Sequence, residues 1–475
     1  RLAHLFRQWG LRPGDGIALL MGNEARFYEF YWAAMRAGLY FTPINTHLTP
    51  GEMQYIAADC DAKVFIVSAA LGEAAGQFAG MLPRVQHGIV SNGALAGFEP
   101  YPQIVAGLPG APIADEVEGM RMLYSSGTTG RPKGIRVPLS GAEATASALT
   151  LAARALFGFR PDDRFLSVGP LYHAAPLVVS SGLHRLGGTV VVMPRFDAQD
   201  ALRLIEMQRI TISQFVPTHF VRLLQLPAAV RQRYDLSSHR TAIHVAAPCP
   251  LHVKQQMIAW WGPILLEYYA GTEGGGTLVT SAEWLKKPGT VGRHWTGGKI
   301  WILDDQGNEL PHGKVGTIYF EASANTSERF EYYKDAKKTA QTYRNHLYTL
   351  SDVGYLDADE YLFLTDRQSY LIISGGVNIY PQEVENVLLT HPAVADAAVI
   401  GVPDEVMGEQ VKAVIELREG ALPGDEVAGA ILAYCRANIA HFKCPRSVDF
   451  VAELPRSAAG KLMKRELKAR YWPNA

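Results

Sequence analysis

The most informative stretch of the chain is a run of small and hydroxyl-bearing residues that follows a short apolar segment. It reads Tyr124-Ser125-Ser126-Gly127-Thr128-Thr129-Gly130-Arg131-Pro132-Lys133-Gly134. Glycines let a backbone turn tightly, so that successive N–H groups can point at phosphate oxygens. The hydroxyls add donors, and Lys133 adds a positive charge. The stretch therefore predicts a phosphate-binding loop, although the same composition is typical of a flexible surface loop.

The order of residues in this loop differs from the Walker A pattern. That pattern places its lysine directly after the last glycine and a Ser or Thr behind the lysine. Here Lys133 precedes Gly134, and Ile135 follows. The stretch instead resembles the phosphate loop of the superfamily of acyl-CoA synthetases, peptide-synthetase adenylation domains and firefly luciferases. The resemblance implies that ATP is bound by Ser125, Ser126, Gly127, Thr128, Thr129, Gly130 and Lys133.

Strand-like runs alternate with helical patterns on both sides of this loop. Ile17–Met21 is apolar throughout, as in a buried strand, and Glu24–Ala37 follows with apolar residues at helical spacing. Strands separated by helices predict βαβ units and mostly parallel sheets. The same order recurs in Thr189–Met193 with Ala198–Met207, in Ile210–Val216 with a following helix, and in Thr241–Ala246 with Val253–Trp261.

The alternation of strand-like and helical patterns ends before residue 299. Lys299–Phe320 has short β-rich runs around the turn residues Asp304–Asn308, which predicts an antiparallel, β-barrel-like segment. Further on, Pro381 is placed to begin a helix, and a small α+β unit is expected from the elements Ala397–Ile400, Val411–Ile415 and Asp425–Asn438. We expect an α/β fold with a large N-terminal domain over residues 1–366, built of mostly parallel βα units plus the β-barrel-like segment. A small mobile C-terminal domain over residues 367–475 follows.

A second motif, Tyr268-Tyr269-Ala270-Gly271-Thr272-Glu273, follows the apolar Ile264–Leu266. A polar turn at the end of a strand is where open α/β sheets bind ligands, although it is also an ordinary strand-to-loop exit. The motif resembles the Tyr-Gly-x-Thr-Glu motif of the same superfamily, with Ala270 in place of the usual first glycine. The resemblance implies that Tyr269 stacks on adenine, that Thr272 contacts the α-phosphate and that Glu273 helps to hold Mg²⁺, which takes one or two protein carboxylates on a nucleotide.

Three further positions resemble nucleotide contacts of the superfamily. Ala246-Ala247-Pro248 would line the adenine side of the pocket, although small residues at a strand end are common anyway. Asp352 would accept hydrogen bonds from both ribose hydroxyls, as a carboxylate can, and Arg367 would reach the same ribose. A lone Asp before glycine is otherwise a typical turn residue. The hinge between the domains would be Ser369, where many relatives carry Asp or Lys.

The remaining motifs concern the acyl and thiol substrates. Ser374, Gly375 and Gly376 resemble the loop that lines the CoA pantetheine tunnel, where glycines let a thin chain pass close to backbone. Lys461, after Gly460, matches the catalytic lysine of the superfamily. A carboxylate is repelled by the triphosphate that it attacks, and an ammonium between them offsets this repulsion.

His173 resembles the aromatic or histidine residue that gates the acyl pocket in the superfamily, which implies a role in substrate binding. A single histidine in an apolar neighbourhood is more often structural. It completes the set of catalytic candidates: Lys461, Thr272, Glu273 and His173.

These motifs predict an ATP- and Mg²⁺-dependent ligase that converts a carboxylic acid and CoA into acyl-CoA, AMP and pyrophosphate through an acyl-adenylate. A medium- or long-chain fatty acid is the first expectation, because Gly274–Gly276 could leave a channel open beyond the carboxylate. An aryl, alicyclic or sterol-side-chain acid remains an alternative. An amino-acid adenylation domain usually has an Asp near Gln214-Phe215, which is absent here. A binding protein without catalysis would have lost Lys461 or Glu273.

Composition limits the remaining classes. With 45 basic and 46 acidic residues, the chain lacks the basic excess of a nucleic-acid binder. Its four cysteines lie far apart without a C-x-x-C pair, as expected for reduced thiols in the cytoplasm. No apolar run approaches the ~20 residues of a membrane-spanning helix. The sequence leaves open peripheral membrane contact, a homodimer, and a trimmed N-terminus, since it begins without Met.

Overall fold

The computed structural model describes residues 1–125, 132–142, 154–247, 249–367, 370–374, 377–404, 407–456 and 462–472. Its first sheet is parallel throughout, with the strand order β5-β4-β3-β1-β2-β6. The strands are β1 (Gly16–Leu20), β2 (Tyr40–Pro43), β3 (Ala62–Val67), β4 (His87–Val90), β5 (Glu99–Pro100) and β6 (Met120–Arg121). Apolar side chains cover both faces of β1 and β3, as buried parallel strands require.

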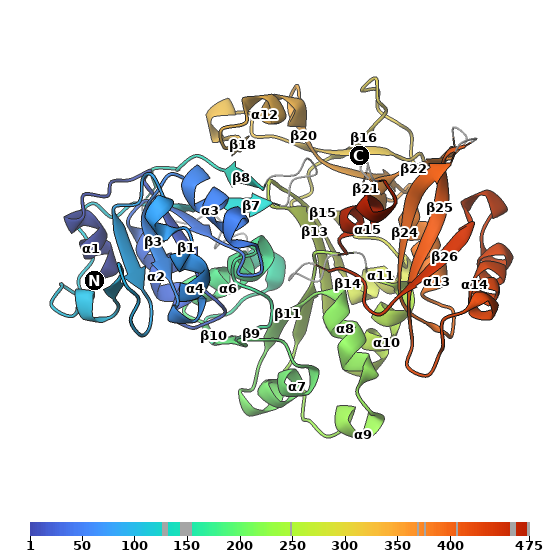
Figure 1. Cartoon of the computed structure of the whole chain (residues 1–475), viewed down its shortest axis with the longest axis horizontal. Helices are drawn as coiled ribbons and strands as arrows, with labels where there is room; N and C mark the ends of the chain where they lie inside the picture. Colours follow the sequence, from blue (N-terminus) through green and yellow to red (C-terminus); the bar gives the residue numbers. More distant parts are fainter. Residues whose placement is uncertain are drawn as a thin grey trace.

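Helices cover both faces of this first sheet, at the blue end of Figure 1. Helices α1 (Leu2–Gln8) and α2 (Phe27–Arg36) pack on one face, and α3 (Pro50–Asp59) and α4 (Gly72–Gly76) pack on the other. Helix α2 begins three residues later than the sequence pattern predicts. Glu24–Arg26 form turns instead, in which the Phe27 N–H donates to the Glu24 carbonyl at 3.0 Å.

The second sheet has the order β10-β9-β11-β12-β13-β14-β15 and is parallel from β10 to β13. Helix α6 (Ala174–Arg185) packs on one face, and α7 (Ala198–Met207), α8 (Pro217–Gln225), α10 (Leu251–Trp261) and α11 (Ser281–Lys286) pack on the other. The short α9 is Ala228–Arg231. The strands are β9 (Arg164–Ser167), β10 (Thr189–Val192), β11 (Ile212–Phe215), β12 (Thr241–His244), β13 (Leu265–Gly271), β14 (Gly274–Thr280) and β15 (Arg293–His294).

Two antiparallel sheets follow, as the sequence predicts for the region after Lys299. The larger has the order β16-β17-β20-β19 with β21 beside β20, and the smaller has the order β18-β8-β7. Helix α12 is Ala336–Thr342. The strands of both sheets are β7 (Leu123–Ser125), β8 (Lys133–Arg136), β16 (Ile300–Leu303), β17 (Gly316–Glu321), β18 (Glu331–Tyr332), β19 (Tyr343–Arg344), β20 (Leu347–Leu356) and β21 (Leu362–Arg367).

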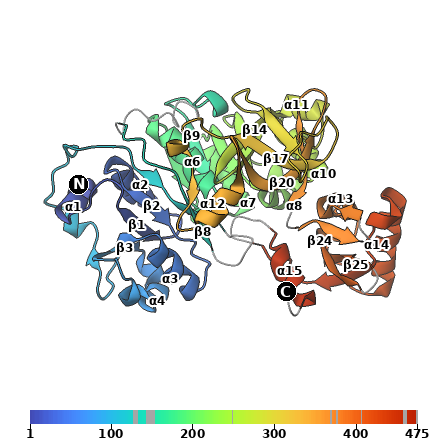
Figure 2. The same ribbon diagram turned by 90° about the horizontal axis from the view of Figure 1, so that it is seen from above.

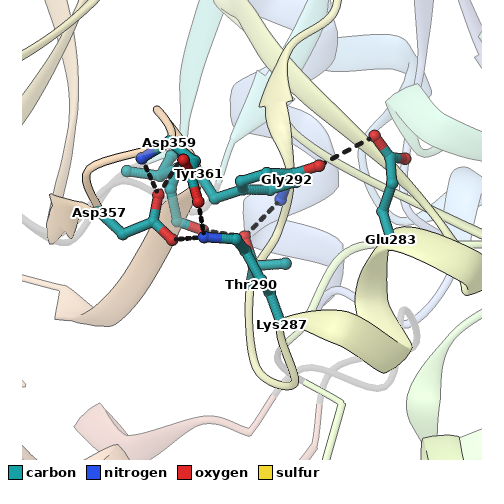
Figure 3. A network of polar contacts seen from close by, with 8 residues as sticks. Glu283, Lys287, Thr290, Gly292, Asp357, Asp359 and Tyr361 are labelled. Carbon is teal, nitrogen blue, oxygen red and sulfur yellow. Dashed lines mark hydrogen bonds and ion pairs between the residues drawn. The ribbon is translucent and has the colours of Figure 1, made fainter.

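A polar network joins the second sheet to the larger antiparallel sheet (Figure 3). Lys287, after α11, pairs with Asp357 and lies 2.6 Å from Asp359 Oδ2 in the β20–β21 turn. The Thr290 hydroxyl donates to the Leu362 carbonyl at 2.8 Å, and backbone bonds link the same two segments. The start of β21 is therefore fixed to the second sheet.

The C-terminal elements form a separate sheet, with the order β23-β22-β25-β24 and β26 parallel to β25. In Figures 1 and 2 this orange and red part lies apart from the first sheet. Helices α13 (Pro381–Leu388) and α14 (Asp425–Asn438) cover one face, and α15 (Lys464–Tyr471) packs on the other. The strands are β22 (Ile372–Ser374), β23 (Val377–Ile379), β24 (Val394–Asp404), β25 (Gly408–Leu417) and β26 (Ser447–Val451). The expected α/β class with a small α+β C-terminal part is confirmed.

Candidate functional site

The β7–β8 hairpin holds the two ends of the predicted phosphate loop. Ser125 is paired with Lys133 across the hairpin, and residues 126–131 between them lie outside the described part of the chain. The Lys133 ammonium pairs with the carboxylate of Asp335, at the start of α12. This contact with Lys133 is the main reason that the pKa of Asp335 is lowered. Lys133, the residue expected to bind a polyphosphate, thus already has a carboxylate as its ion-pair partner.

The second motif lies in a longer strand than the sequence predicts. Strand β13 continues through Gly271, because Tyr268 and Tyr269 pair with β14, and only Thr272 and Glu273 form the turn. The expected polar turn from residue 268 onward is therefore wrong. Aromatic residues favour a pleated, half-buried strand, and the pairing with β14 cannot be seen in β13 alone.

Tyr269 and Glu273 contact the antiparallel sheets beside this turn. The Tyr269 hydroxyl donates to Asp352 Oδ2 at 2.6 Å, and the Tyr332 hydroxyl donates to Glu273 Oε1 at 2.7 Å. A Cβ on Gly271 would lie 2.6 Å from the side chain of Leu350 in β20, so the turn packs tightly on that strand. Three sheets therefore converge at the β13–β14 turn.

Two residues of this region have a backbone conformation that non-glycine residues rarely adopt. Ala246, just after β12, has φ +83°, and Ser351, just before Asp352, has φ +62°. Such conformations cost of order 1–3 kcal/mol and cluster at functional sites. Ala247 follows Ala246, and Pro248 lies outside the described residues. The strain at both positions supports the reading of these segments as part of a site.

The model brings part of the predicted nucleotide site together. Asp352 is buried and stands opposite Arg367 in the β20–β21 ladder, which places both backbones at one edge of the sheet. Outside the described residues are the positions Ser126, Gly127, Thr128, Thr129, Gly130, Pro248, Ser369, Gly375, Gly376 and Lys461.

Comparison with protein families identifies the chain. A family model described as AMP-binding enzyme matches residues 1–328, and one described as AMP-binding enzyme C-terminal domain matches residues 383–461. The chain belongs to the AMP-binding enzymes. This confirms the expected membership of the adenylate-forming superfamily and the expected class, an AMP-forming acid–thiol ligase.

Individual relatives extend over almost the whole of this AMP-binding enzyme. A feruloyl-CoA synthase from Amycolatopsis sp is 34% identical and covers 99% of the chain and 92% of its own length. The long-chain-fatty-acid–CoA ligase FadD13 of Mycobacterium tuberculosis is 30% identical, with coverages of 99% and 91%. The ATP-bound crystal structure of MatB from Rhodopseudomonas palustris superimposes with a TM-score of 0.85 at 29% identity, covering 99% and 91% of the two chains.

The predicted acyl- and thiol-binding residues of this AMP-binding enzyme lie in two separate places. His173 directly precedes α6, and its ring lies 4.7 Å from that of Tyr172. Ser374 ends β22 and is buried, and it pairs with Val377 across the two predicted CoA-loop glycines. The two places therefore belong to different parts of the fold.

The glycine run after Glu273 does not border open space. A Cβ on Gly275 would lie 2.8 Å from the ring of Phe320, and one on Gly276 would lie 2.4 Å from the ring of Trp295. The expectation of an open channel beside these glycines is therefore wrong, because the rings of Phe320 on β17 and of Trp295 just after β15 fill the space. Sequence alone cannot show which side chains fold against a glycine.

The family implies a divalent cation, and the residues present fit a Mg²⁺ ion that is bound mainly through the nucleotide. Within the described ranges no group of three or more His, Cys, Asp or Glu could hold a metal ion. Glu273 offers a single carboxylate, with Tyr332 on one of its oxygens. This suits Mg²⁺ that takes most of its ligands from phosphates and water. In the described part of the chain no helix is long and apolar enough to cross a membrane.

Proposed function

We propose that this AMP-binding enzyme is an acyl-CoA synthetase that works in two steps. In the first, a carboxylate oxygen attacks the α-phosphorus of ATP, the α–β phosphoanhydride bond breaks, and pyrophosphate leaves. In the second, the CoA thiol sulfur attacks the acyl carbon, AMP leaves with the electron pair of the broken bond, and the thiol proton passes to solvent. The products are acyl-CoA, AMP and pyrophosphate.

The convergence at the β13–β14 turn carries this proposal. Tyr269, Thr272 and Glu273 come from one strand end, and Asp352 comes from the facing sheet. We assign Tyr269 and Ala246–Ala247 to the adenine, Asp352 and Arg367 to the ribose, and Thr272 to the α-phosphate. Magnesium on Glu273 would neutralise developing charge on the polyphosphate when bound.

The C-terminal part supports the roles of Lys461 and the CoA loop through the geometry of its described neighbours. Arg456 and Leu462, the described residues on either side of the segment that contains Lys461, form a β-bridge. Lys464 Nζ lies 2.8 Å from Glu385 Oε1 on α13, with both side chains almost fully buried, which fixes the chain just after this bridge to the C-terminal sheet. We propose that Lys461 serves adenylation, and that rotation of the C-terminal domain at Ser369 then presents Ser374–Gly376 to CoA.

The two half-reactions test the assignment of Lys461. In Lys461→Ala we expect pyrophosphate release to be lost while synthetic acyl-AMP is still converted to thioester. Lys468→Ala is the matched control, because Lys468 lies on α15 and pairs with Glu409 at 2.8 Å. Equal loss of both half-reactions in Lys461→Ala would contradict the proposed role.

For the acid, a medium- or long-chain fatty acid stays the first candidate, in line with the ligase from Mycobacterium tuberculosis. We propose this substrate class on that likeness alone, because the expected channel beside the glycine run is filled. Alicyclic and sterol-side-chain acids remain alternatives on the same pocket.

A specific observation favours an aryl acid with a hydroxyl group as the second candidate. Gln214 Nε2 donates to the Tyr268 hydroxyl at 3.3 Å, and Gln214 Oε1 is buried without a hydrogen-bond partner among the described residues. Burial raises the pKa of Tyr268, so its hydroxyl keeps a proton to donate. Tyr268 lies three residues before Gly271, or ~10 Å along the strand. A substrate hydroxyl ~10 Å from the reacting carboxylate would donate a hydrogen bond to Gln214 Oε1 and accept one from the Tyr268 hydroxyl.

A panel of acids distinguishes the two candidates. AMP formation is measured with fatty acids of graded length and with cinnamic acids with and without a ring hydroxyl. A hydroxyaryl acid should lose at least tenfold in kcat/KM in Gln214→Leu, whereas a fatty acid should not. If no acid in the panel gives AMP, the ligase proposal fails.

The same proposal includes the domain boundary, the location in the cell, the cation and the oligomeric state. We place the domain boundary between residues 366 and 367, at the last residue of β21 and before the hinge. We also propose that the enzyme acts in the cytoplasm, that Mg²⁺ is its cation, and that it handles no nucleic acid. Equilibrium sedimentation would decide between a monomer and a homodimer.

A further inference from the structure

Four consecutive residues, Tyr332–Asp335, connect the predicted nucleotide site to two other parts of the molecule. Tyr332 donates its hydroxyl to Glu273 Oε1 at 2.7 Å. Three residues later, Asp335 pairs with Lys133 at the end of the phosphate-loop hairpin. The segment thus touches both the carboxylate expected to hold the cation and the lysine beside the phosphate loop.

The middle of the segment is anchored to the first sheet. The Tyr333 hydroxyl donates to Asp61 Oδ2 at 2.8 Å, and Lys334 Nζ lies 3.0 Å from Asp61 Oδ1. Lys334 also donates to the Asp59 carbonyl at 2.7 Å. These contacts fix the backbone on which the Tyr332 side chain is carried, so that the phenol has little freedom to follow a moving partner.

The backbone of Tyr332 is held as well. Tyr332 pairs with Ile135 in β8, and its N–H donates to the Thr339 hydroxyl at 2.9 Å. Its ring is buried and lies 5.9 Å from that of Phe330 in an edge-to-face arrangement. The phenol is therefore fixed by the ladder, by α12 and by ring packing, independently of its hydrogen bond to Glu273.

We infer that Tyr332 is a positioning residue for Glu273 in the binding of Mg·ATP, a role that rests on the proposed function. A glutamate has three rotatable side-chain bonds, and its carboxylate can turn either oxygen toward a cation. The bond from Tyr332 occupies Oε1 and would leave Oε2 available to a cation. Hydrogen-bond partners of metal ligands act in this way, and their loss typically costs 10–100-fold in metal affinity.

Binding of the non-cleavable analogue α,β-methylene-ATP, followed by titration calorimetry, tests this inference without turnover. In 5 mM Mg²⁺ we expect Tyr332→Phe to weaken binding by ~10–100-fold. In EDTA the same variant should bind the analogue within about twofold of the wild type, because the tyrosine acts through the cation ligand. Loss of affinity in both conditions would show a general structural defect and overturn the inference.

Tyr333→Phe is the matched control, since it removes the same hydroxyl from the neighbouring residue, whose partner is Asp61. It should leave the magnesium dependence unchanged, because the contacts of Lys334 and the pairing of Tyr332 with β8 still hold the backbone. A second comparison uses Glu273→Gln, in which adding Tyr332→Phe should cost no more than about twofold further. A full additional loss would contradict action through Glu273. If the wild-type protein does not bind the analogue at all, the proposed function fails, whereas equal binding by wild type and Tyr332→Phe refutes only this inference.

Discussion

The buried ion pair between Lys254 and Glu267 provides a sharp test of how the site is supported. Lys254, on α10, is fully buried and pairs with Glu267 on β13, two residues before Tyr269. The ammonium also lies 4.8 Å from the centre of the Trp284 ring. We consider the substitution Lys254→Met, which keeps the length and apolar stem of the side chain but leaves the Glu267 carboxylate without its cation.

The other basic side chain that lies close to Glu267 is neutral in the wild-type protein. His244 Nε2 lies 3.5 Å from Glu267 Oε2, but burial, with a smaller contribution from the charge of Lys254, lowers the pKa of His244 well below its usual value. Removing one partner of a buried pair typically costs 3–5 kcal/mol. The unfolding entropy is ~2.1 cal/mol/K per residue, which gives ~0.77 kcal/mol/K for a unit of ~366 residues. The melting temperature should therefore fall by ~4–6.5 °C.

Differential scanning fluorimetry at pH 7.5 measures this shift. Lys299→Met is the control, because Lys299 pairs with Glu309 at 2.7 Å on the surface, with both side chains nearly half exposed. An exposed pair is worth less than ~1 kcal/mol, so the control should shift by about 1 °C or less. The double variant Lys254→Met/Glu267→Gln should recover most of the loss, since no buried charge remains. If Lys254→Met melts no lower than Lys299→Met, the reasoning about an uncompensated charge is refuted.

Three further predictions concern the acyl pocket, acid stability and the thiols. Trp295→Ala removes the ring that fills the space beside the glycine run, so the enzyme should accept acids of greater chain length. Values of kcat/KM for acids of graded chain length measure this, and an unchanged profile would place Trp295 outside the acyl pocket. Burial lowers the pKa of His239 to about 3, so below pH ~6.5 the unfolded chain binds one proton that the folded protein does not bind. The unfolding free energy should therefore fall by ~1.4 kcal/mol per pH unit between pH 6 and 4 through this group. His239→Gln should reduce that slope by the contribution of one proton, and an identical slope in the variant would contradict the assignment. Burial raises the pKa of both Cys60 and Cys435 to about 12. Both thiols should therefore be unreactive toward Ellman's reagent at pH 8 until the protein is denatured. Fast labelling of either thiol in the native protein would contradict this prediction.

Local signals predicted the elements that depend on local interactions. The helix expected over Ala198–Met207 has these bounds in the structure, because Asp197 caps it by accepting a hydrogen bond from the Asp200 N–H at 2.8 Å. The helix at Asp425–Asn438 likewise has the predicted bounds. In both, apolar periodicity and helix-terminal residues agree, so the choice of structure needs little help from the rest of the chain.

Features that depend on contacts between distant segments were not visible in the sequence. Strand β13 extends to Gly271 only because β14 pairs with it, and the space beside the glycine run is filled by Phe320 on β17 and by Trp295 just after β15. Tyr332 lies 59 positions from its partner Glu273, in a segment that carries no motif of its own. Spacing within one motif cannot reveal such a partner, whereas the motif residues could be proposed from sequence because their chemistry is concentrated in short stretches.

Isotope exchange between pyrophosphate and ATP is the most direct test of the central claim, which is that a carboxylic acid is activated as an acyl-adenylate before any thiol takes part. The enzyme is incubated with ATP, Mg²⁺, radiolabelled pyrophosphate and the acid that gives most AMP, in the absence of CoA. We predict label in ATP that requires the acid, is lost in Glu273→Gln, and needs no CoA. Exchange that occurs without the acid, or only when CoA is present, would contradict a free-standing adenylation step at this site.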